Sequence, residues 1–131
     1  MNRVLIPVLF ALAATAAHAQ MTKVVDTGDR SFYLDTKTMP NTGNVRRVAV
    51  VEDYAAAQAN GMRSRQLMLE VDCSGLQLRG LSSTDYAEPM AAGRTVETSN
   101  TPSDWLYVGT PTGQLVPPQT PYRTIWQTVC R

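Results

Sequence analysis

Two cysteines separated by almost half the chain constrain this sequence most. Cys73 lies near the middle, and Cys130 is the next-to-last of 131 residues. An even cysteine count in an exported chain predicts one internal disulfide, the alternatives being an intermolecular bridge or two free thiols. Closing so long a loop should stabilise the fold by about 4 kcal/mol in the chain-entropy model. A small domain gains from such a cross-link because it buries a smaller fraction of its surface than a large one.

The first 19 residues have the three parts of a secretion signal. Arg3 supplies a positive charge, residues 4–14 form an uncharged apolar run, and Ala17-His18-Ala19 matches the cleavage pattern of small residues. The alternative, a membrane anchor, needs roughly 20 apolar residues, and this run is shorter. We expect cleavage after Ala19, which separates a signal peptide (1–19) from one domain (20–131).

The mature chain is expected to be free in the periplasm or secreted. The residue directly after the cleavage site is Gln20 and not cysteine, so we expect no lipid attachment there. We also expect no stable membrane insertion after cleavage. Without Arg3, the remaining 11 basic side chains equal the 11 acidic ones in number. Balanced charge does not favour nucleic acid or an anionic membrane as the partner.

The mature sequence is typical of short β-strands separated by turn residues. In the segment 64–73, Leu67, Leu69, Val71 and Cys73 alternate with polar residues, which places Cys73 on the apolar face. The segment 54–61 is compatible with a helical turn or a hairpin loop, 86–93 with an irregular crossing, and 109–119 with an extended connector. The predicted strands are 22–25, 31–35, 45–53, 64–73, 76–82, 95–98 and 105–108.

The last segment has helical spacing instead. Tyr122, Ile125, Trp126 and Val129 recur at the interval that places them on one helix face, and Thr120 and Pro121 are suited to the helix start. A helix of about three turns is marginal alone in water, so it needs a surface to pack on. The apolar face of 64–73 is the obvious one, and the bridge would then join helix to sheet. Strands followed by one terminal helix indicate an α+β fold.

The mature sequence lacks the residue types that several common catalytic mechanisms require. The only histidine is His18, which leaves with the signal, so no Ser-His-Asp or Cys-His site and no histidine-ligated metal is expected. With both cysteines oxidised, no thiolate nucleophile remains. We therefore predict no enzyme activity, no catalytic or metal-binding residues and no cofactor.

Carboxylates remain as candidates for acid–base chemistry. Glu70 and Asp72 share a strand face and could form a glycosidase pair, but the polar face of an amphipathic strand is the favoured interpretation. Asp26 and Asp29 flank a glycine and could bind calcium, although aspartate and glycine are ordinary turn residues.

Arginines and aromatic residues are the candidates for a contact surface. Arg63 and Arg65 face the same way, which indicates either a small basic stripe for an acidic partner or, as the favoured interpretation, solvated charge. Exposed aromatic side chains would be contact residues, whereas core packing is the default for Trp105 and Trp126. The other candidates are Tyr33, Tyr54, Tyr86 and Tyr107.

Short pieces spread along the mature chain occur in a distinctive order, with aspartate before the first cysteine and valine-cysteine at the end. They are Tyr33-Leu34-Asp35, Asp53-Tyr54, Ser64, Glu70-Val71-Asp72-Cys73, Leu81-Ser82, Tyr86, Gly93, Trp105 and Thr128-Val129-Cys130. In this order they resemble the bacterial surface-adhesin protein E-like family over nearly the whole mature chain.

That resemblance implies a curved antiparallel sheet of about six strands with a C-terminal helix on its concave face. It also implies that the tether is the Cys73–Cys130 disulfide. The named member of the family is an outer-membrane lipoprotein that binds host matrix and plasma proteins, and the resemblance allows a homodimer. This chain differs in lacking a cysteine for lipid attachment at the mature N-terminus, and no adhesive motif carries over.

Three functions follow as hypotheses. The first is a non-enzymatic, exported module of a Gram-negative bacterium that binds a protein partner of unknown identity. The second is periplasmic capture of a small ligand such as haem in a pocket between helix and sheet, near Met62, Met68, Tyr122 and Trp126. The third is an enzyme that uses Glu70 or Asp72, which requires that carboxylate to lie in a cleft with a raised pKa. The residues that would bind a ligand are unknown from sequence.

Overall fold

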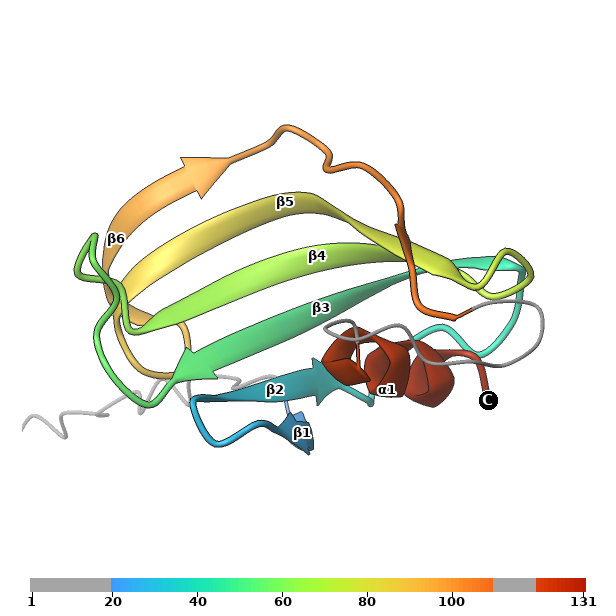
Figure 1. The fold of residues 1–131 in the computed structure, drawn as a ribbon, viewed down its shortest axis with the longest axis horizontal. Helices are drawn as coiled ribbons and strands as arrows, with labels where there is room; N and C mark the ends of the chain where they lie inside the picture. Colours follow the sequence, from blue (N-terminus) through green and yellow to red (C-terminus); the bar gives the residue numbers. More distant parts are fainter. Residues whose placement is uncertain (1–19, 110–119) are drawn as a thin grey trace, which may run out of the picture.

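Strands with apolar residues at alternate positions form one antiparallel sheet in the computed structural model, which describes residues 20–109 and 120–131 (Figure 1). The strand order is β1-β2-β3-β4-β5-β6, with β7 paired to β5, and each pairing is antiparallel. The elements are β1 (Met21–Asp26), β2 (Arg30–Asp35), β3 (Val45–Tyr54), β4 (Ser64–Asp72), β5 (Gln77–Glu88), β6 (Ala92–Ser99), β7 (Leu106–Tyr107) and α1 (Thr120–Val129).

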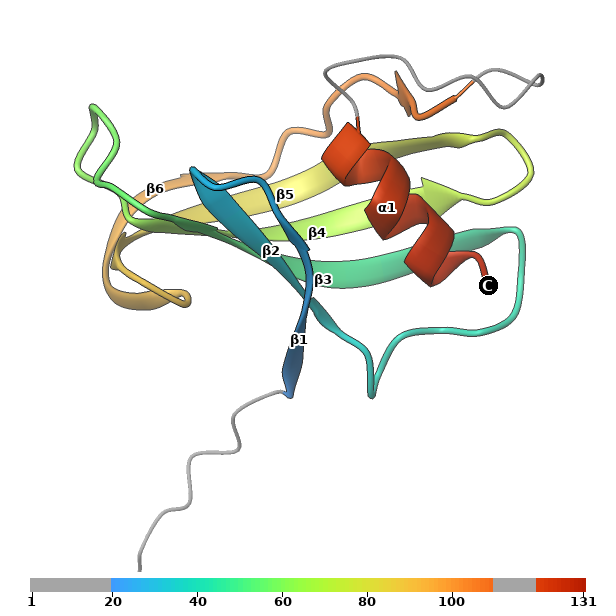
Figure 2. The ribbon, with the colours of Figure 1, turned by 60° about the horizontal axis from the view of Figure 1, so that its bottom comes forward.

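The helix lies across the concave face of the curved sheet, as Figure 2 shows, so the predicted α+β architecture is confirmed. Ile125 and Val129 are 0% and 1% exposed, while Tyr122 and Trp126 pack against the same core and remain half-buried. This is the predicted helix face. The sheet supplies the other half of the core, chiefly Phe32, Leu34, Val48, Val50, Leu69, Val71 and Leu78.

Both edge strands of the β1-to-β6 sheet depart from regular pairing. The register of β1 with β2 shifts between Lys23 and Val25, and that of β5 with β6 shifts on both sides of Tyr86. Bulges twist an edge away from further pairing, which is one way in which proteins protect exposed edges from adding a strand.

One prediction about the chain between β4 and β6 was wrong. The segment 86–93 is no irregular crossing, because β5 continues to Glu88 and β6 begins at Ala92. Shifts in register let β5 extend past the point where sequence alternation fails. The ambiguous segment 54–61 is the β3–β4 hairpin loop, and the predicted strand 105–108 is only the two-residue β7. The signal peptide and nearly all of the predicted connector lie outside the described residues.

Candidate binding surface on the concave side of the sheet

The C-terminal end of α1 is bound to the sheet by a disulfide and a hydrogen bond. Cys73 and Cys130 are bonded, with their Cα atoms 5.5 Å apart. One residue before Cys73, the Asp72 carbonyl accepts a hydrogen bond of 3.0 Å from the Trp126 indole nitrogen. Strand alternation places Cys73 on the apolar face of the sheet, and helical spacing places Cys130 beside the apolar face of the helix. The bridge between the two cysteines could therefore be predicted from sequence.

An arginine adds a third contact at the same end of the helix. Arg46 on β3 donates a hydrogen bond of 2.6 Å from its guanidinium to the Val129 carbonyl. Carbonyl groups in the last turn of a helix have no intrahelical partner, and the helix dipole favours a cation there. Arg46 therefore satisfies a free helix carbonyl. Its chain neighbour Arg47 lies on the other face of the sheet, 3.5 Å from Glu70.

The N-terminal half of α1 is held by a buried carboxylate. Glu52 on β3 is 1% exposed, and its Oε1 accepts a hydrogen bond of 2.8 Å from the Tyr122 hydroxyl. Its Oε2 accepts a hydrogen bond of 2.9 Å from the Tyr54 hydroxyl and lies 3.4 Å from the Arg30 guanidinium. Glu52 was not predicted as a site residue. The sequence contains a signal for it, because Glu52 continues the alternation of Val48 and Val50 and so belongs to the core face.

Burial and the adjacent negative charge both act on the tyrosines around Glu52. Desolvation, followed by the charge of Glu52, raises the pKa of the Tyr122 phenol well above its ordinary value of 10.0. The pKa of Tyr54 is raised by the same two causes. Both phenols therefore stay protonated at physiological pH and remain donors to the carboxylate.

A second buried ion pair continues this polar region toward β5. Asp85 is 3% exposed and accepts hydrogen bonds of 2.6 and 3.1 Å from the Arg65 guanidinium, a bidentate pairing. This hydrogen bond is the main reason that the pKa of Arg65 is raised. The cross-strand neighbours of Arg65 are Glu52 and Asp85, both acidic, so Arg65 is not part of a basic stripe.

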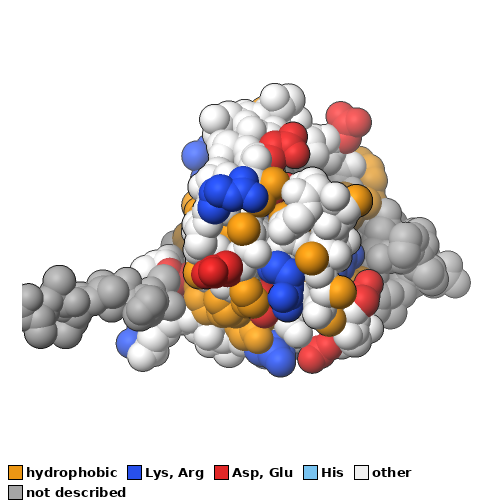
Figure 3. All heavy atoms as spheres, turned by 90° about the vertical axis from the view of Figure 1, so that its left-hand side faces the viewer, with side chains coloured by type: hydrophobic (Ala, Val, Ile, Leu, Met, Phe, Trp, Pro, Cys, Tyr) orange, Lys and Arg blue, Asp and Glu red, His pale blue; other side chains and the backbone are white. Residues whose placement is uncertain are grey.

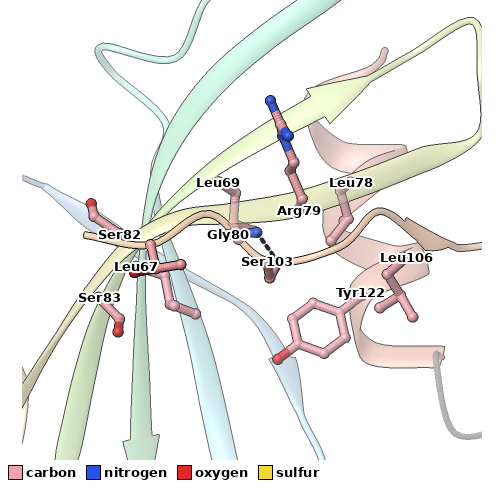
Figure 4. A pocket seen from close by; sticks show the side chains of 11 residues that line it. Leu67, Leu69, Leu78, Arg79, Gly80, Ser82, Ser83, Ser103, Leu106 and Tyr122 are labelled. Carbon is pink, nitrogen blue, oxygen red and sulfur yellow. Dashed lines mark hydrogen bonds between the residues drawn. The ribbon is translucent and has the colours of Figure 1, made fainter. Parts of the chain in front are cut away.

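An open hollow of about 240 Å³ lies beside the helix rather than beneath it (Figure 4). Its lining includes Leu67 and Leu69 of β4, Leu78 of β5, Leu106 of β7 and Tyr122 of α1. The space directly between helix and sheet, where the small-ligand hypothesis expected its pocket, is filled by the buried side chains of Ile125 and Val129.

The β5–β6 turn presents an apolar side chain on a strained backbone. Met90 and Ala91 both have positive φ, at 57° and 55°, although neither is glycine. Their amides donate to the Asp53 carboxylate at 3.1 Å and to the hydroxyl of the buried Ser64 at 2.9 Å. Ser64 in turn donates to the Glu88 carbonyl at 2.6 Å. These bonds hold a turn in which the Met90 side chain is 42% exposed.

The carboxylates considered for catalysis lie apart from the hollow and have structural contacts. Glu70 faces the convex side, 8% exposed, with Arg47 at 3.5 Å and Arg79 at 2.9 Å. The sequence pattern predicted a solvated side chain on the polar strand face. In the structure, two arginines cover Glu70 instead. Asp72 accepts hydrogen bonds from Gln77 and from the Gly75 amide, which lower its pKa. The direction is opposite to that required of a general acid.

The remaining sequence candidates have ordinary structural surroundings. In the β1–β2 turn, Asp26 accepts from the Gly28 amide at 2.9 Å, and Asp29 accepts from the Thr27 hydroxyl. Both interactions lower the pKa of the aspartate concerned. Among the five aromatics proposed as contacts, Tyr107 is 61% exposed and the others are half-buried, with Trp105 stacked under Arg79.

No single sign of charge occupies the end of the molecule that carries the β3–β4 and β5–β6 connections. Figure 3 shows Lys and Arg side chains there interspersed with acidic and apolar ones. In residues 20–109 and 120–131, no helix has the length and apolar character needed to cross a membrane.

The fold and these contacts define a class: a small sheet domain whose terminal helix is fastened at both ends, leaving loops and a hollow beside it open. The family model for surface-adhesin protein E matches residues 19–131. The chain therefore belongs to the surface-adhesin protein E family. No curated protein matches it significantly. Family membership and the disulfide together indicate an exported protein.

Proposed function

We propose that this chain is a non-enzymatic binding module, active in the periplasm or outside the cell, that engages a protein partner through the β5–β6 turn. Membership of the surface-adhesin protein E family supports the binding role. The observation that carries the choice of surface is the turn at Met90 and Ala91, where two successive non-glycine residues adopt positive φ.

Left-handed backbone is costly for residues with a side chain, at roughly 1–2 kcal/mol each. Such strain persists only where the surroundings impose it, and it is concentrated at functional positions. Here the surroundings are the buried Ser64 and the Asp53 carboxylate, which bind the two amides of the turn. The result is a rigid turn that presents Met90, and a rigid apolar anchor is suited to protein contacts because little freedom is lost on binding.

Pull-down from envelope extract of the source organism with the mature protein tests this proposal. We expect a Met90→Ser variant to lose at least about tenfold in partner binding, the scale of an interface hot spot. Met68→Ser is the matched control, because Met68 is also an exposed methionine, at 37%, but lies on the convex face of β4. Equal binding by both variants would exclude the turn as the contact.

The absence of catalysis is tested separately. We expect purified mature protein to show no turnover in esterase, glycosidase and peptidase panels. Glu70 is the carboxylate to vary, because it is buried between Arg47 and Arg79 and was a candidate for acid–base chemistry. A turnover that disappears in the Glu70→Gln variant would overturn the non-enzymatic assignment.

A further inference from the structure

The hollow beside α1 has an apolar floor and an aromatic wall. Figure 4 shows the side chains of Leu67, Leu78, Leu106 and Tyr122 arranged around it, on four separate elements of the fold. The volume of about 240 Å³ is below the ~300–1,000 Å³ of pockets that hold drug-sized ligands. Its occupant must therefore be smaller, close to the size of one substituted aromatic ring.

The walls are already in place. Leu69 and Leu78 are each 2% exposed, so the core fixes them, and the Tyr122 hydroxyl is held at 2.8 Å by Glu52. On the far side, Ser103 is bound to Gly80 in both directions: the Ser103 amide donates at 2.8 Å, and the Ser103 hydroxyl accepts at 3.0 Å. A ligand would need little rearrangement of these groups, which removes one cost of binding.

Among the residues that the structure describes, no unpaired charge is directed at the hollow. Arg79 belongs to the lining, but Figure 4 shows its side chain pointing away, and its guanidinium is bound to Glu70 at 2.9 Å and stacked 4.6 Å from the Trp105 ring centre. The polar groups at the rim are hydroxyls. Among them, the Ser83 hydroxyl takes part in no hydrogen bond within the described part of the chain, and the same is true of the Ser82 and Thr101 hydroxyls. A charged ligand would lose its hydration here without gaining a counter-charge.

We propose that this hollow is a binding site for small, uncharged molecules that combine a single apolar ring with one hydroxyl or amide group. The ring packs against the leucines and Tyr122, and the polar group bonds to the Ser83 hydroxyl at the rim. This site is separate from the protein contact proposed at Met90, since no residue of the β5–β6 turn lines it. Either proposal can therefore fail without the other.

Amide NMR titration of the mature protein with benzyl alcohol tests the proposal. We expect saturable shifts confined to the lining, at Leu67, Gly80, Ser103 and Tyr122. Benzoate and benzylamine have the same ring but a charge, and both should bind at least about tenfold more weakly, since no described lining residue offers an unpaired counter-charge. Diphenylmethanol, which has a second ring, should not cause these shifts because it exceeds the volume.

Variants then assign the site. Ser83→Leu fills the hollow and should weaken benzyl alcohol binding at least about tenfold. Thr84→Leu is the matched control, because Thr84 is the next residue on β5 and faces the opposite side, against Gln66. Gly80→Val serves as a second filling variant if Ser83→Leu folds poorly. The added Cβ would meet only the Ser103 hydroxyl, at 3.7 Å.

Three results would overturn the proposal. One is the absence of saturable shifts with benzyl alcohol in the wild-type protein, which needs no variant. Another is equal binding of the charged and uncharged rings, because that contradicts the chemistry inferred for the lining. The last is unchanged binding after a filling substitution in a folded variant, which would place the ligand elsewhere.

Discussion

The Tyr122 hydroxyl on α1 donates a hydrogen bond of 2.8 Å to the carboxylate of Glu52, a residue 70 positions earlier on β3. The helix is thus fastened near its N-terminal end by this bond and near its C-terminal end by the disulfide at Cys130. A helix attached at one end alone could pivot on the concave face. Attachment at both ends fixes its position and also forms one wall of the neighbouring hollow.

Removal of the Tyr122 hydroxyl should destabilise the protein. In the Tyr122→Phe variant, Glu52 loses one of its donors while staying buried, and hydrogen bonds to charged groups contribute about 1.5–3 kcal/mol. Urea unfolding of the reduced and oxidised proteins measures this change. Tyr54→Phe is a useful comparison, because Tyr54 bonds to the same carboxylate but belongs to β3 rather than to the helix. An unchanged free energy of unfolding in Tyr122→Phe would show that the helix does not depend on this contact.

The same bond predicts a dependence of stability on alkaline pH. The folded pKa of Tyr122 lies above the unfolded value near 10.0, so the folded state retains the proton more tightly. This contribution is complete below pH 10.0 and is lost as the pH rises through the folded pKa. Stability measured across alkaline pH should therefore fall less steeply in Tyr122→Phe than in wild type. Parallel curves would contradict the raised pKa.

The disulfide should hold the helix more than the sheet. Replacement of both Cys73 and Cys130 by serine opens a loop with a sequence separation of 57 residues. The chain-entropy model gives a loss of about 4 kcal/mol for a loop of this length. Thermal melting should shift downward, while circular dichroism retains the strand signal. Tryptophan fluorescence in a Trp105→Phe background, where Trp126 is the remaining tryptophan, should report the loosened helix. If reduction leaves the melting temperature unchanged, the bridge does not brace the fold.

Acid should weaken the β4–β5 turn, which contains Cys73. Asp72 has a lowered folded pKa because of Gln77 and the Gly75 amide, so its contribution is present above its ordinary pKa of 3.8 and is lost as pH falls through the lowered value. Unfolding measured from about pH 5 down to about pH 2 should show a shallower decline in Asp72→Asn than in wild type. Asp104→Asn, at an exposed position outside this turn, is the control and should follow the wild-type curve.

Substitution by glycine in the strained β5–β6 turn should not reduce the stability of the protein. Ala91→Gly removes a Cβ from a residue with φ of 55°, where left-handed backbone costs roughly 1–2 kcal/mol. The added freedom of the unfolded chain offsets only about 0.5–1 kcal/mol of this. The variant should be as stable as wild type or more so. Ala49→Gly in β3, where no strain is relieved, should be less stable by about 0.5–1 kcal/mol. Equal losses in both variants would argue against strain at Ala91.

The alternation of apolar and polar residues along the strands is the reason that the disulfide could be predicted from sequence. It placed Cys73 on the apolar face and Cys130 beside the apolar helix face, and the structure joins them. The same alternation contained Glu52, but a charged residue within an apolar series has no assigned partner until the fold is known. The burial of Asp85 was not predicted for a related reason, since its ion pair depends on the cross-strand pairing with Arg65.

Local sequence patterns specify three features of this protein: the cysteine pair, the alternating strands and the apolar face of the terminal helix. These depend on side-chain periodicity over a few residues, which the backbone geometry of strands and helices dictates. Four other features become visible only in the folded chain: the contact between Tyr122 and Glu52, the length of β5, the hollow beside α1 and the turn at Met90. Each of these depends on register and packing between segments far apart in the chain, which no local pattern specifies.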